Sequence, residues 1–182
     1  MRVRQMAVDL GAALAAGYVA TRVSDRAQSL LYRMTPVSEK LREPDYPDCS
    51  TAEQAARMAA DSVGIARTRR RIGVLKSCIH YGLGMGWSAI YPPLRRRGIG
   101  PLAAGVATGA SLSLLVDEAL CPALGITAPN SAYPPTSHAR GVATHLVYGL
   151  AVAVAAETLH RLLARAGAVQ PLPDDSPTVS AT

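Results

Sequence analysis

The stretch GIGPLAAGVATGASLSLLV, from Gly98 to Val116, contains no charged residue. A helix of this length, with a rise of about 1.5 Å per residue, is roughly 28 Å long, close to the roughly 30 Å hydrocarbon core of a bilayer. Arg95–Arg97 precede the stretch, and Asp117 and Glu118 follow it. Because charged residues flank an uncharged run, we predict a membrane-spanning helix over residues 98–120.

Small residues line one face of this predicted helix. Gly105, Gly109 and Ser113 recur at every fourth position. Such a row lets the backbones of two membrane helices approach closely. We expect the row to pack against the preceding glycine-rich segment, which contains the pair Gly82 and Gly86. These five residues are our predicted helix-packing seam.

The composition favours a membrane protein. Of the 182 residues, 49% are hydrophobic but only 4% are aromatic, and there is no Phe. Soluble cores usually rely on large rings, whereas membrane helices pack through Gly, Ala and Ser. The formal net charge is +6, but the arginines cluster beside apolar runs, so we predict no nucleic-acid partner. The three cysteines form no CxxC pair, which indicates neither a zinc site nor a disulfide framework.

A first spanning helix is predicted over residues 6–23, after the basic residues Arg2 and Arg4. A cleaved signal peptide is the alternative interpretation of this pattern. Asp9 lies inside the apolar run and argues against it. We expect the helix to continue as an amphipathic segment until Pro36 ends it.

Two more spans are predicted, over residues 72–94 and 142–163. The former is the most polar of the four, because it contains Lys76 and His80. We expect Pro92-Pro93 to end it, and the arginine turn that follows to join it to the third span in a tight antiparallel hairpin.

The long polar segment 34–71 separates the first two spans. Turn-forming residues dominate Arg42–Ser50, which we predict to be a loop. Ser50 and Glu53 then fit a capping box ahead of an Ala-rich helix. This helix either docks on the bundle or lies on the membrane surface with Arg67–Arg71 near the headgroups.

Together these features predict an all-α fold: an integral membrane bundle of four transmembrane helices with a helical extramembrane first loop. The membrane domain covers residues 1–168. The Pro-, Ser- and Asp-rich residues 169–182 are predicted to be a disordered tail. Placing both termini inside leaves one charge on the loop after the third span, in keeping with the positive-inside rule, whereas it places Arg67–Arg71 outside, which conflicts with that rule.

Two short motifs resemble a known family. The turn LGITAP (Leu124–Pro129) follows the third span, and HLVYG (His145–Gly149) begins the fourth. With the four-helix layout, they resemble the YagU-like family of small bacterial inner-membrane proteins. The resemblance implies a multi-pass helical protein of the bacterial inner membrane, and it implies little chemistry because the family's molecular activity is not established.

Ionisable residues inside spans are functional candidates, because burying them in lipid is costly. We expect a site at the end of the third helix, beside the Pro-rich loop. The candidate polar site consists of His80, Asp117, Glu118, His145 and Tyr148.

Three other ionisable residues have simpler interpretations. Asp9 and Lys76 lie near helix ends, where they can reach water. Glu157 precedes His160 and Arg161 by three and four residues, which is the spacing of an ion pair within one helix.

The sequence contains no nucleotide-binding loop, GxSxG or HExxH motif. Our first hypothesis is a non-catalytic partner or structural subunit of the membrane, with a role in envelope stress tolerance. The alternatives are a small proton- or ion-conducting protein that uses His and acidic residues, and a membrane enzyme with a His/carboxylate metal site. We predict no cofactor, and expect the lipid bilayer and either a membrane-protein partner or a second copy as partners. A soluble helical bundle is the remaining alternative.

Overall fold

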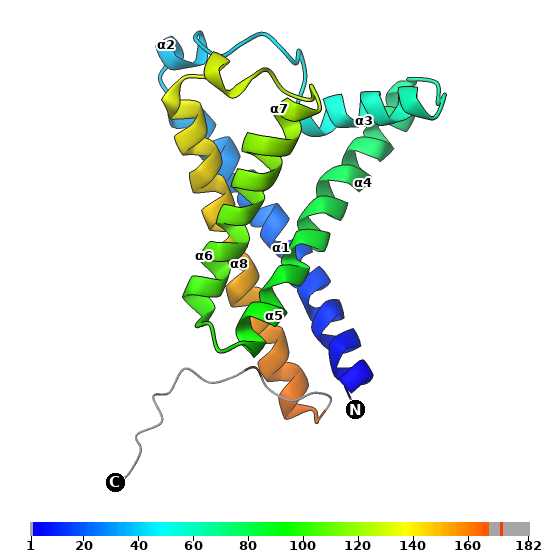
Figure 1. The fold of residues 1–182 in the computed structure, drawn as a ribbon, viewed down its shortest axis with the longest axis vertical. Helices are drawn as coiled ribbons and strands as arrows, with labels where there is room; N and C mark the ends of the chain where they lie inside the picture. The colour runs from blue at the N-terminus through cyan, green and yellow to red at the C-terminus, as the bar shows by residue number, and fades with distance from the viewer. Residues whose placement is uncertain (1, 168–171, 173–182) are drawn as a thin grey trace.

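Long helices dominate the computed structural model, which describes residues 2–167 and Leu172 (Figure 1). Within these residues the chain is helical with no strand, so the all-α prediction is confirmed. The two longest helices are α1 (Arg2–Met34) and α8 (Pro135–Arg165). They pack against each other more extensively than any other pair.

The predicted third span forms one unbroken helical stretch. It begins as α6 (Pro101–Leu112), widens into the π-helical segment η2 (Ser113–Leu120) and ends as α7 (Cys121–Ala123). The start lies three residues later than predicted. Gly98 adopts a φ of +82°, which turns the chain, and Pro101 occupies the first helical position, where proline is well tolerated.

In the part of the chain that the structure describes, three helical stretches are long and apolar enough to cross a membrane: Val3–Met34, Pro101–Ala123 and Pro135–Arg165. Segment 72–94 is not among them. Its helix α4 (Arg69–Trp87) starts with three arginines, which lowers its hydropathy.

The apolar end of segment 72–94 divides into two short elements. They are the 3₁₀ turn η1 (Ser88–Ile90) and α5 (Tyr91–Arg96). The expectation that Pro92-Pro93 ends the helix is wrong. Both prolines lie in the first turn of α5, where no backbone N–H is required, and the helix continues to Arg96.

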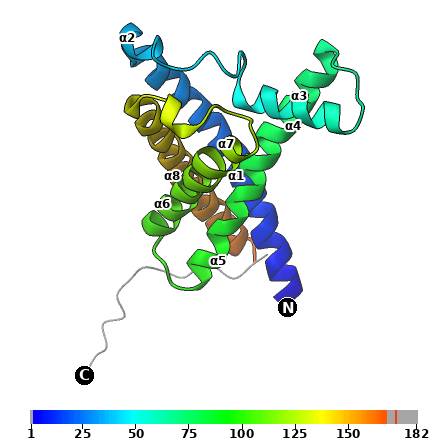
Figure 2. The same cartoon turned by 45° about the horizontal axis from the view of Figure 1, so that its top comes forward.

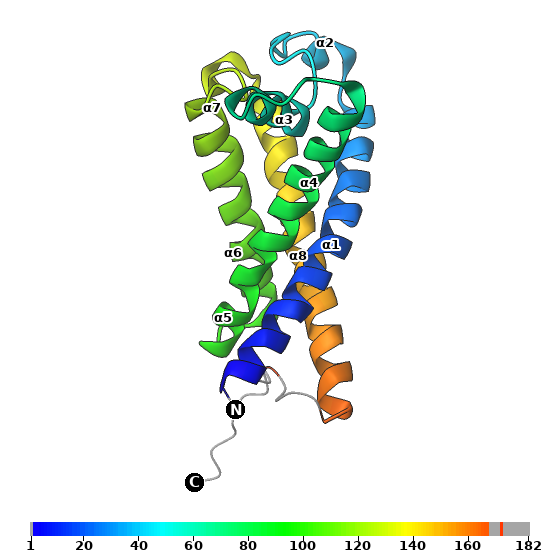
Figure 3. The ribbon, with the colours of Figure 1, turned by 90° about the vertical axis from the view of Figure 1, so that its right-hand side faces the viewer.

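The helices give the molecule two ends (Figure 3). We call the end with the start of α1 and the Arg95–Arg97 turn the lower end. The upper end carries α2 (Val37–Lys40), α3 (Thr51–Ser62), α7 and the 3₁₀ turn η3 (Asn130–Ala132). Both α1 and α8 reach the lower end, so the two ends of the helical domain lie on the same side.

Helices α3 and α4 form an arm at the upper end, where α3 lies across the start of α4 (Figures 1 and 2). The Ser50 half of the predicted capping box is present, because the Ser50 hydroxyl accepts a hydrogen bond from the Glu53 N–H. The Glu53 carboxylate pairs instead with Arg57 and Lys76. Ala56 and Ala60 of α3 are fully buried against Ile72 of α4. Of the two predicted positions for this helix, the structure therefore shows docking on a neighbouring helix.

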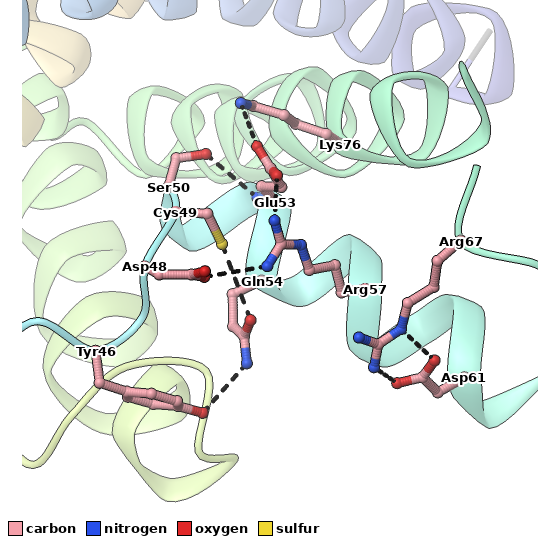
Figure 4. Close-up of polar contacts among 10 residues, drawn as sticks. All are labelled: Tyr46, Asp48, Cys49, Ser50, Glu53, Gln54, Arg57, Asp61, Arg67 and Lys76. Atoms are coloured by element: carbon pink, nitrogen blue, oxygen red, sulfur yellow. Dashed lines mark hydrogen bonds and ion pairs between the residues drawn. The ribbon is translucent and has the colours of Figure 1, made fainter. Parts of the chain in front are cut away.

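Polar contacts reinforce the arm (Figure 4). The Lys76 ammonium lies 3.2 Å from a Glu53 carboxylate oxygen, which links α4 to α3. The side-chain amide of Gln54 donates to the Tyr46 hydroxyl, and that hydroxyl donates to the Gly125 carbonyl at 2.7 Å. The arm is thereby fastened to the loop that follows α7.

The predicted packing seam has a different partner from the one expected. A Cβ atom added at Gly105 would lie 2.9 Å from the carbonyl oxygen of Gly149, and one added at Gly109 would meet the backbone of His145. The row on α6 therefore packs against α8 and not against the second predicted span. The Trp87 indole N–H of α4 donates to the Ser111 hydroxyl of α6 at 3.0 Å. Ser113 continues the row and is also buried.

Gly82 and Gly86 do not serve as packing positions, because an added Cβ would meet nothing within 4 Å at either. The glycine of α4 that does pack is Gly84, which lies against Gly17 and Thr21 of α1. Two residues along a helix correspond to about 200° of rotation, so Gly84 faces away from its two neighbours in the GxxxG pair.

The core contains few large side chains. The largest that are fully buried include Tyr91, Tyr148 and Val152, and alanines of α1 and α8 fill most of the remainder. The predicted tail lies outside the described residues except for Leu172, which is buried against this core.

Candidate functional site

A polar pocket of about 180 Å³ lies at the upper end, where η2 and α7 meet the start of α8. The residues that give it its chemistry are Asp117, Glu118, Cys121, Tyr133, His138 and Arg140. The pocket lies where the third helix ends, beside the Pro-rich loop. We treat it as the candidate site and call it the upper pocket.

His138 is the central group of the upper pocket. Its Nδ1 lies 2.8 Å from a Glu118 carboxylate oxygen, and its Nε2 lies 3.1 Å from the Asn130 carbonyl oxygen. With Glu118 ionised, both partners are acceptors only, so both hydrogen bonds require the cationic imidazolium. The Asn130 amide in turn donates to the Glu118 carbonyl at 2.7 Å, which closes the network.

Asp117 and His145 form a second pair beside the pocket. The His145 Nδ1 lies 3.3 Å from an Asp117 oxygen and 2.9 Å from the Gly141 carbonyl. The carboxylate projects from the π-helical segment η2, a type of distortion that recurs at functional sites. At the start of the same segment, the buried hydroxyl of Ser113 has no hydrogen-bond partner among the described residues.

Arg140 links the upper pocket to the polar segment 34–71 through Glu43. Its guanidinium bonds with Glu43 at 2.8 Å and lies 5.1 Å above the Tyr32 ring. Burial raises the pKa of the nearby Tyr133 phenol, which therefore stays neutral at physiological pH. Each charged group of the pocket lies beside a group of opposite charge, which favours a structural role for them, although the buried Arg140 Nε has no hydrogen-bond partner among the described residues.

The structure does not assemble the predicted five-residue site. His80 pairs with Asp25 of α1 at 2.8 Å, and the two side chains are 42% and 41% exposed. Tyr148 is buried, and its hydroxyl donates to the Gly84 carbonyl. The expectation that His80 joins the site is wrong. Helix α4, which carries His80, packs on α1 and α3, whereas α6 packs on α8.

A second polar cluster lies at the lower end. The Asp9 carboxylate accepts hydrogen bonds from Gln5 at 2.8 Å, from Arg96 at 3.0 Å and from His160 at 3.0 Å. His160 is 1% exposed, and its Nδ1 lies 2.9 Å from the Ala156 carbonyl. Sequence reasoning missed this cluster, and the lone Asp9 in an apolar run was the signal that could have found it.

Glu157 belongs to the same end. It accepts hydrogen bonds from Arg95 at 2.7 Å and from the Tyr91 hydroxyl at 2.9 Å. Its predicted pairing with His160 and Arg161 is wrong. A buried carboxylate needs a partner on the core side, and α5 supplies Arg95, whose side chain is 3% exposed.

No group of three or more His, Cys, Asp or Glu side chains is placed to hold a metal ion in the part of the chain that the structure describes. The His and carboxylate side chains that the metal-enzyme hypothesis requires are therefore not brought together in these residues. Comparison with family models, with curated proteins and with solved structures gave no match for this chain.

Proposed function

We propose that this chain is a multi-pass protein of the bacterial inner membrane that acts as a non-catalytic partner or structural subunit. Three candidate spans support the membrane location. Large apolar side chains along them are exposed, including Leu102 (68%), Leu115 (57%) and Val154 (69%). Contiguous apolar surface is unfavourable in water and favourable against acyl chains.

We propose a fourth span along α4, η1 and α5. Lys76 is the only charged residue between Ile72 and Leu94, and it pairs with Glu53 at the upper end. The helical path runs from the upper to the lower end beside the other long helices (Figure 3). Four crossings agree with the position of both domain ends on one side.

The separation of the polar clusters is the observation that favours a structural role. His145 and Glu157 are twelve residues apart on α8, or about 18 Å. The buried residues between them are Tyr148, Gly149, Val152, Ala153 and Ala156. A proton relay needs titratable groups or water across the membrane, and this packed layer offers one phenol already bonded to α4.

Residues of the two motifs that suggest the family likeness contact neighbouring helices and loops. His145, Tyr148 and Gly149 of the HLVYG motif contact η2, α4 and α6 respectively. Gly125 of the LGITAP turn adopts a φ of +69° and accepts the hydrogen bond from Tyr46. Membership in the YagU-like family stays a prediction, and these contacts give its two motifs a role in helix assembly.

Reconstitution into vesicles tests the proposal against its alternatives. We expect the protein to stay in membranes through salt and alkaline washes, and to pass no protons or ions between about pH 5 and pH 8, where histidines titrate. A proton or ion flux in the wild type that disappears in His145→Ala would contradict the structural role and favour a conducting protein. Stoichiometric bound metal, lost in the same variant, would favour the enzyme instead.

A further inference from the structure

We propose that the upper half of α1 binds the phosphate headgroup of an anionic phospholipid. A shallow groove of about 460 Å³ runs along this part of the helix. Its lining consists of Arg22, Asp25, Arg26, Ser29, Leu30 and Arg33. We call it the arginine groove.

The arginine groove has an excess of positive charge. Arg22 donates to the Tyr81 hydroxyl at 3.2 Å, whereas Arg26 and Arg33 make no hydrogen bond or ion pair with any described residue. The acidic residue of the lining, Asp25, is bonded to His80. Two guanidinium groups are thus available to an anion, and their planar forks suit the oxygens of a phosphate.

The arginines share one face of α1. They stand at intervals of four and seven residues, which places their side chains above one another. Ser29 lies between Arg26 and Arg33 on the same face, and its hydroxyl donates to the Asp25 carbonyl at 2.8 Å, so the donors that face outward are the guanidinium groups. The face therefore presents a row of donors along the helix axis.

The surface directly below the arginine groove is apolar. Tyr18 and Val19 are 48% and 49% exposed, and Gly11 and Ala15, which continue this face further down the helix, are also exposed. The Tyr18 ring lies 5.4 Å from the Tyr81 ring, which places two tyrosines at the boundary. Tyrosines are enriched where acyl chains meet headgroups.

This apolar-to-basic change selects a phospholipid as the ligand. Acyl chains can lie along the exposed surface of Gly11, Ala15, Tyr18 and Val19 while the phosphate reaches Arg26 and Arg33. A soluble acidic segment would match the charge but leave the adjoining apolar surface uncovered. The inference rests on the proposed membrane location, since the groove must lie at headgroup depth.

Native mass spectrometry of the full-length protein in detergent tests this inference. Phosphatidylglycerol and phosphatidylcholine are titrated separately, and the apparent dissociation constant of the first bound lipid is measured. A basic residue near an anionic surface strengthens binding by about five-fold, so Arg26→Gln with Arg33→Gln should weaken phosphatidylglycerol binding by about 30-fold. Binding of phosphatidylcholine should not change.

Two matched variants complete the experiment. Arg69→Gln with Arg70→Gln removes the same charge from exposed positions of the arm and should leave phosphatidylglycerol affinity unchanged. Arg26→Lys with Arg33→Lys keeps the charge and should retain most of the affinity. Equal affinity of the wild type and the double glutamine variant of the groove, or equal loss in the arm variant, would overturn the inference. Failure of the protein to enter phosphatidylcholine vesicles would instead overturn the proposed membrane location.

Discussion

The contact between α6 and α8 makes Gly149→Ala the most informative substitution. An added Cβ would lie 2.7 Å from the Gly109 nitrogen and 2.9 Å from its Cα, and would also meet the Gly105 carbonyl. Ordinary van der Waals contact for such a Cβ begins at 3.4 Å. All three contacts are with backbone atoms, so no side chain can rotate away. The helices must separate by at least about 0.7 Å, because the Gly105 oxygen lies closer than the Gly109 nitrogen.

The size of the effect follows from this separation. A gap of about 0.5–1 Å removes a quarter to a half of the dispersion energy of the atoms across it. Overpacking of a tight core costs about 1–3 kcal/mol, and we expect Gly149→Ala to reach the upper part of that range because the gap extends along the interface. SDS titration of the protein in mild detergent, followed by circular dichroism, measures the loss.

Gly86→Ala provides the matched control. It makes the same chemical change inside a helix, but the added Cβ meets nothing within 4 Å. Replacing an unconstrained helical Gly with Ala should stabilise the protein by about 0.5–1 kcal/mol. If Gly149→Ala were as stable as wild type, or Gly86→Ala lost as much, the assignment of the glycine contacts would be refuted.

Three further predictions concern the polar contacts and the topology. Arg95→Ala leaves the Glu157 carboxylate buried without its cation and should cost about 3–5 kcal/mol in the same titration. The hydrogen bond from Lys76 lowers the pKa of Glu53, so the contact stabilises the arm at neutral pH and loses this contribution as pH falls below the ordinary value of 4.5. The protection factors of the α3 amides, which are corrected for the intrinsic pH dependence of hydrogen exchange, should therefore fall there. With both termini inside, Cys49 should react with a membrane-impermeant maleimide on intact cells.

Each of these predictions has its own control. Arg97→Ala removes an exposed neighbour in the same turn and should cost little. Glu53→Gln should reduce the pH dependence of the α3 protection factors and leave only the part that comes from Asp61, whose pKa Arg67 also lowers. An unchanged pH profile in that variant would contradict the ion-pair explanation. Cys121 is buried and should react only after unfolding. Labelling of Cys49 only after cell lysis would reverse the predicted orientation.

The two polar clusters explain how an aromatic-poor bundle is held in register. At the lower end, Asp9 joins α1 to α8 and to the Arg96 turn. At the upper end, Glu118 and His138 join η2 to the start of α8. Since mispairing would leave a carboxylate buried without a cation, these contacts specify one arrangement of helices that are otherwise rich in interchangeable alanines.

Local patterns determined the helices. Uncharged runs bounded by arginines located the third helix, and the capping box at Ser50 located the start of α3. Pro36 follows shortly after the end of the long first helix. These features depend on hydropathy and backbone propensity, which act between near neighbours in the chain and can be read without knowing the fold.

Tertiary structure decided which helices touch. Gly105 and Gly109 are suited to any close backbone, and only the path of the chain assigned them to Gly149. The sequence offered Arg161, four residues away, as a partner for Glu157. In the folded chain Glu157 pairs instead with the buried Arg95. Gly98–Val116 thus specified a helix with a packing face by itself, because spacing along a helix is local. Its partner depended on contacts between residues distant in sequence, since each helix offers several faces of similar composition.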